Sequence, residues 1–194
     1  MIILMLLLNL GISWLNCWAV GGMWAETKAT GGFPRLLAWC GAVQAAVGFS
    51  SVLLYGLGYV LHATGYMPDS AFKAAMQLWY VLVVVPAIGT GLFILIESWI
   101  IAFRTRSILD MASAAYNTFA MAHNIYGATK NMWSALSGVG DFFSTDGDGE
   151  GGGVVLLVVA LVAASLLGGV ILTAVLIRRY AGRLPDPRKH ALAS

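Results

Sequence analysis

Residues 151–177 read GGGVVLLVVALVAASLLGGVILTAVLI, a stretch without a single Asp, Glu, Lys or Arg. Three further stretches, residues 1–25, 36–68 and 74–103, also lack these residues apart from Glu97. Each is longer than the roughly 20 apolar residues that cross a hydrocarbon core about 30 Å thick. Lipid offers no partners for backbone N–H and C=O groups, so each stretch is predicted to be a helix. The sequence therefore predicts an all-α, polytopic membrane protein with four transmembrane helices.

Composition favours one membrane domain over residues 1–194. Apolar residues make up 59% of the chain and charged residues 10%, well below the ~25% charged content of soluble domains. The net charge of +2 is too small for a nucleic-acid-binding surface, so we expect no nucleic-acid partner. Cys17 and Cys40 both fall inside predicted spans, which favours buried thiols over a disulfide.

The boundaries of the spans follow from turn residues and charges. A charged turn precedes Pro34, which suits the first turn of the second helix, and Asp69 or Ser70 is expected to cap the third. The fourth span follows a Gly-rich acidic segment that is predicted to be flexible. The predicted spans cover about residues 1–25, 36–64, 75–103 and 154–177, with the acidic linker at 144–153 and a basic C-terminal tail at 178–194.

A long amphipathic helix is predicted between the third and fourth spans, over about residues 107–140. Its apolar face consists of Ile108, Met111, Ala115, Phe119, Ala122, Ile125, Tyr126, Met132, Trp133, Leu136 and Val139. The opposite face carries Asp110, Asn117, Asn124 and Asn131. A column of small residues consists of Ser113, Ala120, Gly127 and Ser134, flanked by Ala114, Ala128 and Ala135. Such a column favours packing against another helix, and the alternative is an interfacial helix that only caps the bundle.

Small residues also recur every four positions in the fourth span, where they form two neighbouring tracks. The first track is Ala160, Ala164 and Gly168, and the second is Ser165, Gly169 and Thr173. These tracks are interpreted either as an oligomer interface or as seats for the three neighbouring helices. The second span has a looser version in Gly41, Ala45, Gly48 and Gly56.

Glu97 is the one carboxylate within a predicted span. An unpaired charge at the bilayer centre costs at least ~2.5–3.5 kcal/mol, so this residue needs a partner, a proton or nearby water. It lies seven residues before Arg104, and the structural interpretation is that it reaches the headgroups. The functional interpretation places it in an ion path in a helix kinked by Pro86. Its candidate partners are Gln44, His62, Asn9 and Asn16.

No enzyme signature is present in the sequence. The three histidines are far apart, and neither they nor the two cysteines have metal-ligand spacing. Nothing in the second span positions Ser50 and His62 as a nucleophile and base. We therefore expect no catalytic residue, metal or cofactor.

Orientation rests on a small difference in basic residues. Four spans put both ends of the chain on one side, with six Lys or Arg there against four near helix ends on the other. The prediction is that both termini are cytoplasmic and the amphipathic segment is outside.

The first functional hypothesis is a non-enzymatic subunit of a homo-oligomeric or multiprotein membrane assembly, such as a secretion or conjugation machine. The alternative is a pore-forming or ion-conducting protein, holin-like or a channel. A transporter is less favoured, because four spans without internal repeats are few for alternating access. The expected partners are the lipid bilayer and either copies of this chain or other membrane subunits. The expected location is a cell membrane, in particular a bacterial inner membrane, as a multi-pass protein.

Overall fold

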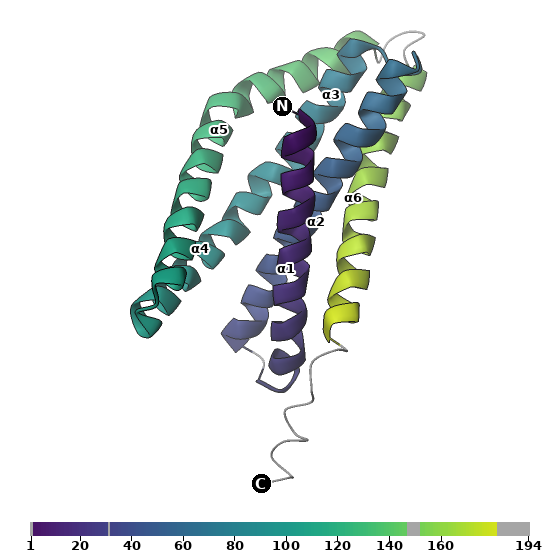
Figure 1. The fold of residues 1–194 in the computed structure, drawn as a ribbon. Helices are drawn as coiled ribbons and strands as arrows, with labels where there is room; N and C mark the ends of the chain where they lie inside the picture. Colours follow the sequence, from purple (N-terminus) through teal and green to yellow (C-terminus); the bar gives the residue numbers. More distant parts are fainter. Residues whose placement is uncertain (1, 31, 147–151, 182–194) are drawn as a thin grey trace.

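The fold is a set of long helices that run back and forth along a common axis (Figure 1). The computed structural model describes residues 2–30, 32–146 and 152–181. Its elements are α1 (Ile2–Thr30), α2 (Gly32–Ala63), α3 (Asp69–Trp79), the π-helical segment η1 (Tyr80–Val84), α4 (Val85–Thr105), α5 (Ile108–Asp146) and α6 (Gly152–Ala181). Within the described residues, four helical stretches are long and apolar enough to cross a membrane. With α5 as the further helix, this confirms the predicted fold class.

Two helices extend beyond their predicted ends. α1 continues through residues 26–30, where a charged turn was expected, because residues 23–30 contain no Gly or Pro. The chain then reverses at Gly32, whose φ of 68° suits glycine. α5 continues to Asp146, six residues past its predicted end. Residues 147–151 of the predicted linker and 182–194 of the predicted tail lie outside the described residues.

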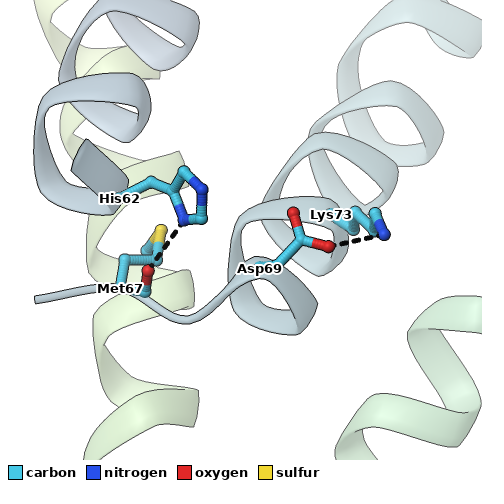
Figure 2. Close-up of polar contacts among 4 residues, drawn as sticks. All are labelled: His62, Met67, Asp69 and Lys73. Carbon is cyan, nitrogen blue, oxygen red and sulfur yellow. Dashed lines mark hydrogen bonds and ion pairs between the residues drawn. The ribbon is translucent and has the colours of Figure 1, made fainter. Parts of the chain in front are cut away.

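The turn between α2 and α3 contains a backbone hydrogen bond on its α2 side and an ion pair on its α3 side. Met67 is buried, and its N–H donates to the Leu61 carbonyl at 3.1 Å. The N-cap position of α3 is Pro68, with no side-chain cap, so the expected cap by Asp69 or Ser70 is not formed. Asp69 instead forms an exposed ion pair with Lys73 at 2.6 Å, as Figure 2 shows.

The third apolar stretch departs from α-helical geometry at η1, directly before Pro86. Proline has no N–H to donate to the carbonyl four residues earlier, and its ring presses on that carbonyl. An added residue in one turn relieves this crowding, which is a common origin of π-helical segments. The irregularity expected at Pro86 is therefore present one turn before it.

The direction of α5 changes the topology that the sequence suggested. Trp99 Nε1 donates to Thr118 Oγ1 at 3.0 Å, and Gly138 packs against Gln77, so α5 runs back along α4 and α3 over its whole length. α6 then runs parallel to α1, with Gly21 beside Tyr180. The predicted placement of both chain ends on one side is therefore wrong. The first residues of α1 and the last of α6 lie at opposite ends of the molecule (Figure 1).

Two apolar cores hold the helices together. The first core joins α2, α3, α5 and α6 near the α2–α3 turn and includes Leu54, Trp79 and Val158. The second core joins α1, α2 and α6 at the other end and includes Phe49 and Leu176. We call α1, α2 and α6 the three-helix bundle, and α4 with α5 the α4–α5 hairpin. The hairpin contributes Phe142 of α5 as a buried residue of the first core, and the partly buried Phe143 packs against that core.

Basic side chains gather at one end of the fold, which we call the basic end. It contains the start of α2, the α4–α5 turn and the end of α6. Its described basic side chains are Arg35, Arg104, Arg106, Arg178 and Arg179. The opposite end contains the α2–α3 turn and the end of α5, with Asp69, Lys73 and Asp141. The structure thus separates charges that lie scattered along the sequence.

Candidate functional site

Glu97 lies on α4, in the half of that helix nearer the basic end. It is half-buried, and it is close enough to Cys40 of α2 for its charge to act on that thiol. Among the residues with described side chains, no ion pair or side-chain hydrogen bond joins Glu97 to a partner. The half-buried carboxyl group therefore has no hydrogen-bonding or ion-pair partner among the described side chains.

Gln44, one of the predicted partners of Glu97, has a different role. Its amide Nε2 donates to the Ala87 carbonyl and to Thr90 Oγ1, both at 2.7 Å. Thr90 also donates to the Ala87 carbonyl at 2.7 Å. Gln44 thus joins α2 to α4, two to three helical turns from Glu97. Thr90 carried no signal in the sequence, because a threonine in an apolar helix usually bonds only its own backbone.

His62 lies at the far end of α2, away from Glu97. Its Nδ1 donates to the Met67 carbonyl at 3.1 Å, and its ring stacks on Phe72 with centroids 5.8 Å apart (Figure 2). Ser50 accepts a hydrogen bond from Trp79 Nε1 at 3.1 Å and lies about 18 Å of helix rise from His62. These two residues therefore do not meet as a nucleophile and base.

The other two candidate partners, Asn9 and Asn16, lie on α1, which packs on α2 and α6. Neither forms a side-chain hydrogen bond to Glu97 in the described part of the chain. The structure therefore does not assemble the polar cluster that the sequence suggested around Glu97.

The two small-residue tracks of α6 lie in different surroundings. Ser165, Gly169 and Thr173 are buried within the three-helix bundle. A Cβ added to Gly169 would lie 2.6 Å from the Ala46 carbonyl oxygen and 2.8 Å from the Ser50 nitrogen. α6 therefore packs against α2 through this track.

The first track lies on the outer side of α6. Ala160 and Ala164 are exposed, and Gly168 is half-buried, with only the flexible end of Leu53 close to it. On α2, Gly41 and Ala45 are buried and Gly41 packs against Val20 of α1, whereas Gly56 has no close neighbour. The side of α6 with Ala160 and Ala164 is left uncovered by the described part of the chain.

α5 packs on α4 and α3 through a narrow seam of residues spaced seven apart. The seam consists of Ala114, Met121, Ala128, Ala135 and Phe142, all buried. Ala120 and Gly127 beside it are half-buried, and Gly127 is in ordinary contact with Tyr80. The three alanines are those that flanked the predicted small-residue column. We expected α5 to pack against protein. Within this chain it does so through these three alanines, which contact α4 and α3.

The predicted apolar face of α5 points away from the bundle. Phe119, Tyr126 and Trp133 form a column, again seven apart, and their exposed fractions are 73%, 65% and 79%. Polar side chains lie on the same exposed surface: His123 stacks on Phe119, and Lys130 lies over the Tyr126 ring. Asn124 and Asn131, from the polar side of the helix, are exposed as well. We call the exposed surface formed by all these side chains the outer face of α5.

Comparison with protein families, with curated proteins and with solved structures finds no match to this chain.

Proposed function

We propose that this chain is a non-enzymatic integral membrane subunit that assembles with copies of itself through the outer face of α5. The observation that carries the proposal is the direction of α5 beside α4. The stretch from α3 through η1 to α4 is long and apolar enough to cross a membrane, and α5 accompanies it from Thr118 at Trp99 of α4 to Gly138 at Gln77 of α3. α5 therefore lies at membrane depth as a fifth crossing.

Polar groups on α5 supply the reason for a protein partner. Asn124, Asn131, His123 and Lys130 are all exposed on this helix. Hydrocarbon provides no hydrogen-bond partners, and polar or charged groups at this depth usually face protein or water. The outer face of α5 is therefore better suited to a protein surface than to lipid alone.

A second copy of the chain fits this surface. A side-chain amide both donates and accepts hydrogen bonds, so a column of asparagines on one helix pairs with the same column on another. Asn at a repeating helical position is also a known determinant of register and oligomer number. The uncovered Ala160 and Ala164 of α6 provide a second surface for close helix approach.

The test is the oligomeric state in lipid nanodiscs, measured by light scattering or native mass spectrometry. We expect an oligomer from the wild type and monomers from Asn124→Leu/Asn131→Leu, because the variant loses its cross-helix hydrogen bonds. The matched control is Asn9→Leu, an exposed asparagine on α1, which should leave the oligomer intact. A monomeric wild type over a wide range of protein-to-lipid ratios would contradict the proposal.

The distribution of charge supports an orientation for this subunit. With α5 as a crossing, one side receives Lys28 and the five arginines of the basic end. The other side receives Lys73, with Lys130 within α5. Cytoplasmic loops carry an excess of Lys and Arg. The basic end is accordingly placed in the cytoplasm and the start of α1 outside, in a cell membrane.

A second candidate function, ion conduction, is favoured by Glu97. A half-buried carboxyl group without a protein partner is typical of groups that face water within a membrane. Glu97→Gln keeps size and hydrogen bonding but removes the charge, so it should change conductance or its pH dependence in planar bilayers. Ser98→Ala on the next position is the control, since its hydroxyl bonds only the Leu95 carbonyl. Wild-type bilayers no more conductive than protein-free ones would eliminate this function.

A further inference from the structure

A groove of about 370 Å³ runs along the three-helix bundle on the half nearer the basic end. Its volume falls in the range of small-molecule sites, which is about 300–1,000 Å³. It is lined by Trp24 of α1, by Trp39, Ala42, Val43 and Ala46 of α2, and by Val170, Thr173, Ala174, Ile177 and Arg178 of α6.

The chemistry of the groove changes along its length. From Val170 to Ile177 its wall on α6 is almost wholly apolar, and at the end it reaches Arg178, which is exposed. That span corresponds to about 12 Å of helix rise. The groove is thus apolar along most of its length and ends at the guanidinium group of Arg178.

Aromatic rings mark the depth of the groove in the membrane. Trp24 and Trp39 meet edge to face at its basic end, with ring centroids 5.1 Å apart, and Trp39 is 53% exposed. Tryptophan is enriched where headgroups meet hydrocarbon. Arg179 and Arg35 are exposed at the same end. The groove therefore begins at headgroup level and continues into the acyl-chain region.

We propose that this groove binds an anionic phospholipid, with one acyl chain along the apolar wall and the phosphate at Arg178. The guanidinium group donates in a fork that matches phosphate oxygens. Additional positive charge at the basic end favours a lipid with net negative charge over a zwitterionic one. A helix of a second copy would use the apolar wall but would have no need of the arginine at its end.

The experiment is native mass spectrometry of the full chain in mild detergent with equimolar phosphatidylglycerol and phosphatidylcholine. We expect the wild type to retain phosphatidylglycerol preferentially. One basic residue near a membrane surface changes anionic-lipid binding by about fivefold, so Arg178→Gln should lower the preference by about that factor. Arg179→Gln, which removes the same charge outside the groove, is the matched control and should have a smaller effect.

A second pair of variants tests the apolar wall without changing charge. Ala174 lines the groove and is exposed, so Ala174→Phe should fill it and weaken retention of both lipids. Val175→Phe, at an exposed position outside the groove, should not. Both positions are exposed, so neither substitution disturbs the helix core.

Three results would overturn the proposal. Equal retention of the two lipids by the wild type would remove the headgroup preference. Displacement of the lipid by excess inorganic phosphate alone would point to a free anion. Loss of oligomer from Ala174→Phe with unchanged lipid retention would assign the groove to a second copy. Lipid retention is read separately from oligomer number, so this outcome does not depend on the assembly proposed above.

Discussion

The three-helix bundle and the α4–α5 hairpin are built on different packing rules. α2 alone buries ten residues, and its glycines and alanines bring α1 and α6 close to its backbone. α4 buries only Ala87 and Ala102, and the buried residues of α5 are single side chains spaced seven apart. Contact through small residues on several sides fixes the bundle. Contact along one seam leaves most of the hairpin's surface to its surroundings.

Small residues have different consequences in the two regions. On α6 the track of Ser165, Gly169 and Thr173 is used within the chain, so it is unavailable to a partner. On α5 the alanines of the seam are buried on one face, so the large apolar side chains on the other face are exposed. The small residues of the bundle are therefore used within the chain, whereas the large apolar side chains of α5 stay exposed.

The largest expected effect tests whether the hairpin crosses the membrane at all. Single cysteines at Ile108 and Ser144, in a Cys17→Ser/Cys40→Ser background, should be labelled from opposite sides, because α5 separates them. In intact cells an impermeant maleimide should reach Ser144→Cys and require permeabilisation to reach Ile108→Cys. Thr64→Cys, at the α2–α3 turn, is the control that should match Ser144→Cys. Labelling of positions 108 and 144 from the same side would show that α5 does not cross the membrane and lies on its surface instead.

The next effect tests the bundle. Gly169→Leu should unfold the protein, because a side chain there meets the backbone of residues 46 and 50, and overpacking of this kind costs about 3 kcal/mol or more. Gly168→Leu should cost less, since the flexible Leu53 side chain is able to move. Ala164→Leu, on the exposed track, should keep the wild-type melting temperature in detergent. Similar melting temperatures for all three variants would show that the tracks do not differ.

A smaller effect is expected at the joint between the two regions. Gln44→Leu removes two hydrogen bonds to α4 and should lower the free energy of unfolding by about 1 kcal/mol. The loss is modest because Thr90 keeps its own bond to the Ala87 carbonyl. A double-mutant cycle with Thr90→Val, measured by titration with a denaturing detergent, isolates the coupling. Additive changes would mean that Gln44 does not hold α4 to α2 through Thr90.

The smallest effect is expected at the turn that connects the bundle to the hairpin. Asp69→Asn removes the ion pair with Lys73, whose two side chains are more than half exposed. Exposed pairs of this kind contribute little to stability, because water and salt screen them. The melting temperature should stay within experimental error of the wild type at physiological salt. A clear decrease would indicate that the α2–α3 turn depends on this pair.

The sequence by itself determined the class of this protein and most of its helices. Uncharged stretches longer than the hydrocarbon thickness have one stable solution in lipid, because each helix satisfies its backbone hydrogen bonds internally. The irregularity near Pro86 and the small residues of α5 and α6 were visible for the same reason: these features act within one helix.

Only the tertiary structure decided which faces meet and where the charges lie. Nothing local to α5 distinguishes a helix on the membrane surface from one that returns along α4, since its periodicity is the same in both. Once α5 returns, the ends of the chain separate, the arginines collect at one end, and Gln44 reaches Thr90 rather than Glu97. These are relations between residues 40 or more positions apart, and they depend on packing over the whole molecule rather than on any one segment.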